Sequence, residues 1–183
     1  MADLVHLPGA TKVYVDHDGS QTSNTYHLLG YTINGVEITH ETFMSDVPGD
    51  QNGGDEGPPI EIQYFGQIAR VRLECSKWDE TIASYIASRH QNVNFNPAAT
   101  TQTVGTLMSA SSKTMALYLH ATVAGLGQGP LVGNVHFPVA IPRSPIEFNK
   151  GSKFARLMLE FECHQSNGVL WDQTTPTSLT ALA

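Results

Sequence analysis

The chain has 183 residues, 40% of them hydrophobic and only 15% charged, with a formal net charge of -7. This length predicts one domain with at most long appendages. Few charges, with 16 glycines and 10 prolines, exclude a coiled coil, a helical bundle and a disordered acidic chain. Lys+Arg amount to 10, far from the clustered excess of an avid nucleic-acid binder. No apolar run is long enough to span a bilayer.

The charge is distributed unevenly along the chain. Residues 1–66 hold 10 acids and one base (net -9), and residues 67–183 hold 7 acids and 9 bases (net +2), which together give the total of -7. Three interpretations stay open: a solvated acidic edge, a surface that must not stick to other anions, and a surface complementary to another copy of the chain.

Hydrophobic residues recur mostly with a period of two, which is typical of half-buried antiparallel strands. The alternation is longest in 67–75 and 154–163. Asn34-Gly35, between two short apolar runs, predicts a hairpin turn. Pro138 cannot donate to a ladder, so its strand is expected at an edge or at a bulge. The predicted strands are 12–15, 31–33, 36–38, 60–65, 67–75, 104–110, 113–121, 135–141, 154–163 and 168–171.

One helix is predicted at about 77–90. Trp78, Ile82 and Ile86 form an apolar stripe, and Ser76 to Asp79 has the character of a capping box. The helix is expected to cross a sheet face or to plug a barrel end. The sequence therefore predicts a mainly β fold, an antiparallel β-sandwich or barrel with this helix and a long acidic loop at 46–59. Residues 1–172 form the single domain, and 173–183 form a C-terminal arm.

Cys75 and Cys163 are the only cysteines, and both fall at inward-facing strand ends. The N-terminus shows no secretory signal, so we expect synthesis and folding in a cytoplasm, where such thiols stay reduced. Both are therefore candidate structural thiols.

No catalytic or metal motif is evident. The segment 50–56 is only superficially like a calcium loop, because its glycines come early and no bidentate glutamate follows at the required spacing. Asp16-His17-Asp18 precedes a glycine and is typical of a turn. Neither a Gly-x-Ser-x-Gly elbow nor a Walker A motif occurs. We therefore expect no enzyme activity, no metal site and no cofactor.

The order of elements resembles that of the major tail tube proteins of tailed bacteriophages. The resemblance rests on two blocks, Glu61 to Ala83 and Pro142 to Cys163, the second followed by Gly168-Val-Leu-Trp171. Such subunits form rings, usually of six, in which neighbouring sheets join into a continuous β-barrel. The rings stack into a tube through which the genome passes, and loops and terminal arms reach neighbouring subunits.

The resemblance implies a virion structural protein of the tail, made in the host cytoplasm. Its partners would be other copies of itself in ring and stack contacts, the neck, the tail terminator and, where present, a sheath. Double-stranded DNA would pass without specific binding, and an acidic lumen would suit that passage. Candidate contact residues are His136 and Pro138 at an inter-subunit edge and, in the inter-ring loop, Asp46, Asp50, Asp55, Glu56 and Pro58.

Three alternatives remain at this point. A capsid decoration (cement) protein or a neck protein would bind a pre-formed structure instead of polymerising along an axis. A glycan-binding β-sandwich would need exposed aromatic residues over a groove, whereas both Trp78 and Trp171 are expected to be buried. An enzyme is disfavoured for want of a motif.

Overall fold

The protein is a closed antiparallel barrel of six strands with three short strands paired beside it, which confirms the predicted mainly β fold. The computed structural model describes residues 4–7, 11–16, 25–47, 61–83, 86, 114–121, 133–143, 147–150, 155–176 and 178–180. The strands are β1 (Leu4–Leu7), β2 (Thr11–Asp16), β3 (Thr25–Val47), β4 (Glu61–Trp78), β5 (Met115–Ala121), β6 (Val135–Pro142), β7 (Glu147–Lys150), β8 (Ala155–His164) and β9 (Ser178–Thr180).

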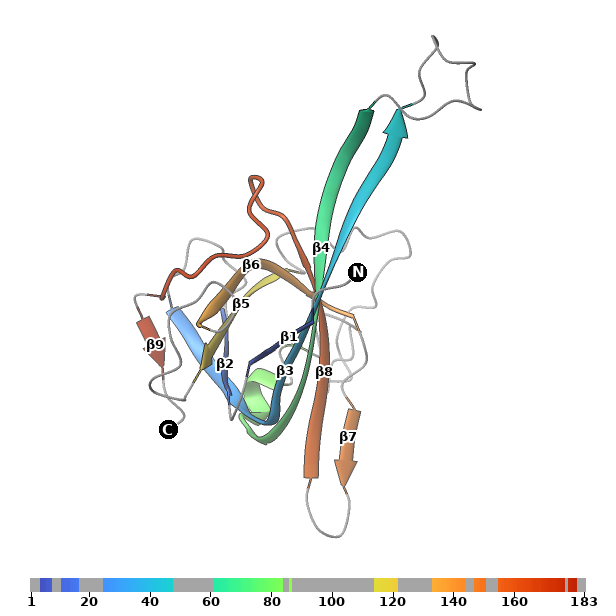
Figure 1. The fold of residues 1–183 in the computed structure, drawn as a ribbon. Helices are drawn as coiled ribbons and strands as arrows, with labels where there is room; N and C mark the ends of the chain where they lie inside the picture. Colours follow the sequence, from blue (N-terminus) through green and yellow to red (C-terminus); the bar gives the residue numbers. More distant parts are fainter. Residues whose placement is uncertain are drawn as a thin grey trace, which may run out of the picture.

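The barrel runs in the order β3-β2-β5-β6-β8-β4 and closes where β4 pairs with β3 (Figure 1). Alternate residues of these strands fill its interior, as the period-two pattern predicts. Val71 and Leu73 of β4 meet Phe161 and Leu159 of β8 in direct register, and all four belong to the core cluster. Trp78 and Trp171 are only partly buried and pack against this cluster.

The hairpin predicted at Asn34-Gly35 is wrong, because β3 continues through it as one strand of 23 residues. Gly35 has φ 84°, and the pairing with β4 jumps from Thr32↔Cys75 to Val36↔Leu73. The pair therefore forms a bulge instead of a turn. The residues after Gly35 pair with β4 on one side and with β1 on the other. This pairing forms more backbone hydrogen bonds than a short local hairpin would.

β4 is likewise one strand of 18 residues, where the sequence predicted two strands, 60–65 and 67–75, on either side of Gly66. Gly66 has φ 134° and lies where the register with β3 shifts. The residues 46 and 47, assigned to the acidic loop, belong to β3, and the rest of that loop lies outside the described residues. The strand predicted at 104–110 also lies outside them.

Pro138 lies at a bulge of β6, one of the two predicted places. The register with β5 passes from Leu117↔Phe137 to Met115↔Ala140. The extra residue reverses the alternation, so Ala140, and not Val139 or Ile141, joins the interior cluster.

The helix begins at Glu80, not at residue 77, because β4 extends to Trp78. Asp79 is the N-cap in place of Ser76: its Oδ1 accepts hydrogen bonds from the backbone N–H of Thr81 at 2.8 Å and Ile82 at 3.2 Å. Ile82, Ala83 and Ile86 lie in the core cluster of the barrel. Residues 84, 85 and 87–90 of the predicted helix lie outside the described residues.

The strand predicted at 168–171 is a tight turn. Asn167 and Gly168 have φ 51° and 80°, and Ser166 and Val169 exchange backbone hydrogen bonds around them. Leu170 is the residue here that is buried, and it joins the core. Residues 168–171 therefore contribute one core residue, Leu170, and do not form a strand.

Candidate assembly surfaces

The most prominent feature of the molecule is a two-stranded arm that projects from the barrel (Figure 1). We define the arm as Phe43–Val47 of β3 with residues 61–66 of β4. Its strands are paired to the tip, from Phe43↔Gly66 to Val47↔Glu61. Each strand of the arm is thus paired along its inner edge, and within the described residues no further strand pairs with its outer edge.

The arm carries five exposed large apolar side chains, although the rest of the described surface has few. They are Phe43, Met44, Ile62, Tyr64 and Phe65, with exposed fractions from 43% to 63%. Met44 and Tyr64 are opposite each other, and Ile62 follows two residues along, so these three share one face. An apolar cluster of this kind marks a contact surface.

Sequence reasoning missed these five residues, although a signal was present. Phe43-Met44 and Tyr64-Phe65 are adjacent apolar pairs within strands of period two. One member of each pair must face away from a core that the other faces. Where both are exposed, the strand has left the barrel.

The base of the arm is held against the segment that follows β8. The side-chain Nε2 of Gln165 donates to the hydroxyl of Tyr64 at 3.1 Å and to the carbonyl of Gly168 at 3.3 Å. A Cβ at Gly66 would lie 3.3 Å from Gln165 Oε1, so the glycine lets this brace approach the strand. The arm therefore leaves the barrel in a defined direction.

The predicted inter-ring loop joins the two strands of the arm. Asp46 lies in β3 next to the tip and is exposed, opposite Ile62. Asp50, Asp55, Glu56 and Pro58 lie outside the described residues. Their contact role stays a prediction.

Two strands border the layer β1-β3-β4-β8-β7. Within the described part of the chain, β1 pairs with β3 and β7 pairs with β8, and neither has a second strand partner. Their outer backbone groups are the kind of edge that another chain can extend. These two edges were not singled out from the sequence, because a four-residue strand gives almost no periodic signal.

His136 and Pro138, the predicted edge residues, lie inside the barrel wall. β6 pairs with β5 and β8, and the backbone of His136 exchanges two hydrogen bonds of 2.9 Å with Asp172. The two residues therefore do not form a free edge within the described chain, because both sides of β6 are occupied. A contact with another subunit at their side chains stays a prediction.

The His136 ring joins two side chains from distant parts of the chain. Its Nδ1 lies 3.0 Å from Oδ1 of Asp172, and its Nε2 lies 2.8 Å from the hydroxyl of Tyr26. With Nδ1–H donating to the carboxylate, Nε2 of His136 accepts a hydrogen bond from the hydroxyl of Tyr26. Burial, then the nearby Asp16 and Asp172, raise the pKa of Tyr26. The hydroxyl of Tyr26 thus links β3 to β6 through the His136 ring.

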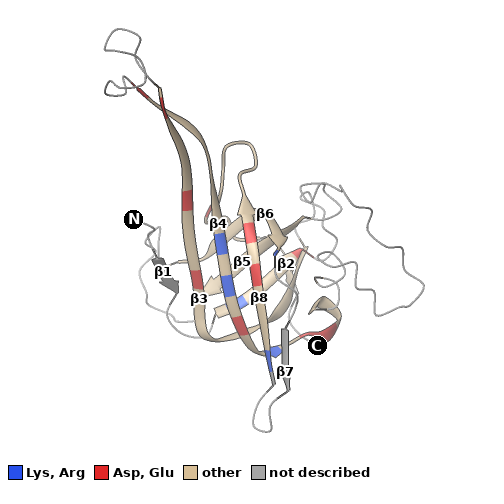
Figure 2. Ribbon diagram, turned by 90° about the vertical axis from the view of Figure 1, so that its right-hand side faces the viewer, with Lys and Arg blue, Asp and Glu red and all other residues tan. Residues whose placement is uncertain are grey.

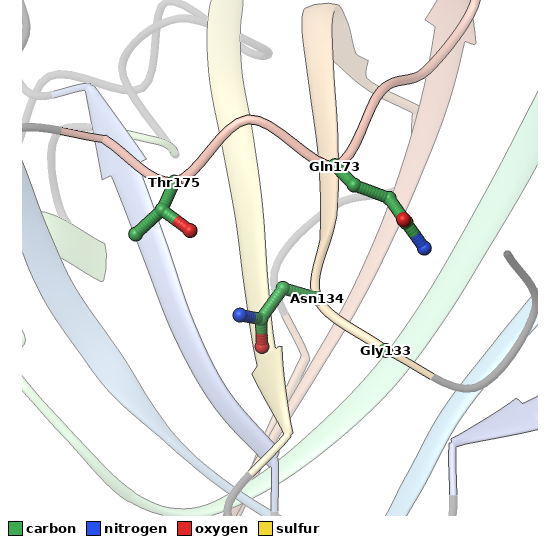
Figure 3. A pocket seen from close by; sticks show the side chains of 4 residues that line it. All are labelled: Gly133, Asn134, Gln173 and Thr175. Carbon is green, nitrogen blue, oxygen red and sulfur yellow. The ribbon is translucent and has the colours of Figure 1, made fainter. Parts of the chain in front are cut away.

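The C-terminal segment, described at residues 172–176 and 178–180, docks on the outside of the barrel. β9 pairs in parallel with β3 at Thr25–His27, and Asp172 bridges to β6. A second apolar cluster lies on the outer side of these strands, formed by Tyr14, Tyr26, Leu28, Ala116 and Tyr118. Between the segment and the start of β6 is a small polar hollow of about 130 Å³, lined by Gly133, Asn134, Gln173 and Thr175 (Figure 3).

A band of alternating charges covers the outer face of β3, β4 and β8 (Figure 2). Arg72 of β4 lies between Glu37 of β3 and Glu160 of β8 in direct register, with Nε 3.2 Å from Glu160 Oε2. The remaining contacts are Arg70 to Glu41 at 3.4 Å and to Glu162 at 3.9 Å, Arg143 to Glu162 at 3.1 Å, and Arg156 to Glu74 at 2.8 Å. We call this surface the charged face.

Cys75 and Cys163 are free, fully buried and part of the core cluster. Burial, with a smaller effect of Glu74, raises the pKa of the Cys75 thiol to about 12. Burial raises the pKa of Cys163 as well, followed by the effect of Glu162. Both thiols are thus protonated and unreactive at neutral pH.

No protein-family model and no curated protein matches the chain. Among solved structures, one described as the tail of an empty GTA particle with C6 symmetry is similar over 89% of this chain and 94% of that chain. The two are 11% identical in sequence, and the TM-score is 0.47. Among the described residues, no helix has the length and apolar character that a bilayer crossing requires.

Proposed function

We propose that this chain is a structural subunit of a phage-type tail and that copies of it form the tail tube. The arm is the observation that supports this best. A two-stranded ribbon alone is marginally stable in water, and five large apolar side chains exposed on it cost further free energy. Contact with another copy buries these side chains and stabilises the ribbon.

The placement of the arm supports growth along an axis. The arm leaves one end of the barrel, and the β7–β8 hairpin leaves the opposite end (Figure 1). A contact between two different surfaces of the same chain is heterologous and repeats without closing unless its rotation closes a ring. The arm of one ring would then lie against the body of the next.

The edges β1 and β7 support ring formation in the same proposal. They border one layer on opposite sides, so β7 of one subunit can extend the sheet at β1 of its neighbour. The resemblance to tail tube proteins suggests six subunits in such a ring. The neck, the tail terminator and a sheath would be the further partners, and DNA would pass through the channel. In this role the chain needs no catalysis and no cofactor.

The test is negative-stain electron microscopy of the purified full chain over a concentration series. Rings or hollow tubes are expected for the wild type. Ile62→Ser with Phe65→Ser should leave the barrel folded and stop tube growth, because the apolar contact is lost. Gln63→Ser is the matched control, since it truncates an exposed polar side chain between them on the same strand.

Two outcomes would contradict the proposal. One is normal tube growth of the double variant, which would remove the arm from the contact. The other is discrete particles of the wild type at every concentration together with binding to empty phage shells. That second outcome would assign the chain to capsid decoration or to the neck.

A further inference from the structure

The charged face holds every arginine that the structure describes. They are Arg70, Arg72, Arg143 and Arg156, and each has a glutamate oxygen within 4 Å. Their side chains are 45% to 61% exposed, whereas Glu74, Glu160 and Glu162 are only 12% to 25% exposed. The guanidinium groups therefore form the outer layer, and most of the carboxylates lie beneath them.

Four exposed arginines on one sheet face would ordinarily bind a phosphate backbone. Guanidinium groups match phosphate geometry and displace the counterions of nucleic acid, which is the main source of non-specific affinity. On the charged face these donors are engaged by carboxylates, the groups with which phosphate would compete. Arg72 has Glu160 on one side and Glu37 in register on the other.

Glu162 is the centre of this arrangement. Its Oε2 lies within 4 Å of Nε of both Arg70 and Arg143, and its Oε1 lies 3.0 Å from Nε2 of His164. Its exposed fraction is 12%, so water screens it less than the other carboxylates of the face. A carboxylate held this way keeps both arginines oriented toward the protein.

Stability alone is a weak reason for so many pairs on one face. Pairs between exposed side chains contribute about 0–1 kcal/mol each. The net charge of the charged face is more informative than the stability of its pairs. Four arginines stand against five glutamates, which leaves the face close to neutral. The five are Glu37, Glu41, Glu74, Glu160 and Glu162.

We propose that the charged face is the surface along which the phosphate backbone of double-stranded DNA passes, and that its glutamates mask the arginines so that DNA is not retained. The presence of DNA rests on the proposed function above. A face of bare glutamates would repel DNA, and a face of bare arginines would hold it. The paired face does neither, so the DNA slides.

The experiment measures binding of a fluorescently labelled duplex of about 20 base pairs to the unassembled full-length protein by anisotropy at low salt. Glu160→Gln with Glu162→Gln removes two negative charges that face the arginines and keeps the arginines themselves. Glu61→Gln with Glu80→Gln is the matched control, because it changes the net charge equally at two exposed residues away from the face. Glu41→Gln with Glu160→Gln is a second unmasked variant that spares Glu162, whose side chain is largely buried.

Wild type and control should bind weakly, and the unmasked variants should bind at least tenfold more tightly with affinity that falls steeply as salt is added. An unmasked variant that is folded by circular dichroism and binds no better than the control would overturn the proposal. Equally tight binding by the wild type would overturn it too. The assay does not depend on tube growth, so discrete particles that bind empty phage shells, with masking intact, would contradict the proposed function alone.

Discussion

The Nδ1 atom of His136 lies 3.0 Å from Oδ1 of Asp172, and this pair fastens the C-terminal segment to β6. The same carboxylate oxygen accepts the backbone N–H of Thr174 at 2.8 Å, and the other ring nitrogen of His136 binds Tyr26. One carboxylate therefore organises the segment, the ring and, through the ring, β3. Tyr26, which this ring binds, belongs to the second apolar cluster on the outside of the barrel.

Asp172→Ala is expected to lower the free energy of unfolding by about 1–3 kcal/mol, because the half-buried Nδ1–H of His136 loses its acceptor. Urea unfolding measures this loss. Hydrogen exchange of the β9 amides should speed up by more than exchange in β5. Thr174→Ala is the control, since it keeps the backbone N–H that Asp172 binds. Equal exchange in the two variants would show that the segment is held by other contacts.

The buried thiols make stability depend on pH in the alkaline range. The folded pKa of Cys75, about 12, lies above its ordinary value of 9.0, so the folded state favours the protonated thiol. The resulting stability is complete below pH 9 and is lost as the pH rises from 9 to 12, by up to about 1.4 kcal/mol per pH unit for each thiol.

Urea unfolding at pH 8, 9.5 and 10.5 checks this for the wild type and for Cys75→Ala with Cys163→Ala. The variant should be less stable at pH 8 but should lose less stability as the pH rises. Neither thiol should react with a thiol reagent at pH 8 until the protein unfolds. Rapid labelling of the native protein would contradict the burial.

Gly30→Ala is expected to destabilise the barrel by about 1–3 kcal/mol or more. Gly30 pairs with Val13 on one side and with Trp78 on the other, and a Cβ there would overlap the carbonyl oxygen of Lys77. Backbone atoms must shift to make room. Thermal unfolding measures the effect, with Gly168→Asn as the control, because asparagine tolerates the positive φ of that open turn.

Replacing residues 48–60 with Asn-Gly separates the loop from the arm. The variant keeps the arm and closes it with a two-residue turn of the kind that antiparallel strands accept. We expect a folded monomer that no longer grows into tubes, in agreement with an inter-ring role of the loop. Tube growth at the wild-type rate, followed by light scattering and microscopy, would assign stacking to the arm alone.

The barrel strands were predictable where one face is buried and the other is wet. Residues 67–75 and 154–163 alternate cleanly because their outer face is the charged face. The strand 113–121 alternates less well, and the reason is now apparent: Ala116 and Tyr118 are buried outside the barrel, beside residues of β2 and β3. Local pattern does not reveal a second layer built by a segment more than fifty residues away.

Long-range pairing also overrode the hairpin turn predicted at Asn34-Gly35 and the boundary between the strands predicted at 60–65 and 67–75. Gly35 and Gly66 have a positive φ suited to a turn, and in both places a long partner strand makes a bulge instead. The prediction for Pro138 was correct, because a residue without a backbone N–H cannot donate to a β-ladder in any context. The alternation of 67–75 and 154–163 places Arg70, Arg72 and Arg156 on outward faces, but their partners on other strands follow only from the register.

β3 carries the arm at one end and the β9 docking site at the other, without a break in the strand. At about 3.3 Å per residue this is a continuous element of roughly 70 Å. A pull on the arm along its length loads the many β3–β4 hydrogen bonds in parallel, so they resist together instead of opening one after another. The subunit can therefore bear tension along the whole length of β3. The strand bends at the bulges beside Gly35 and Gly66.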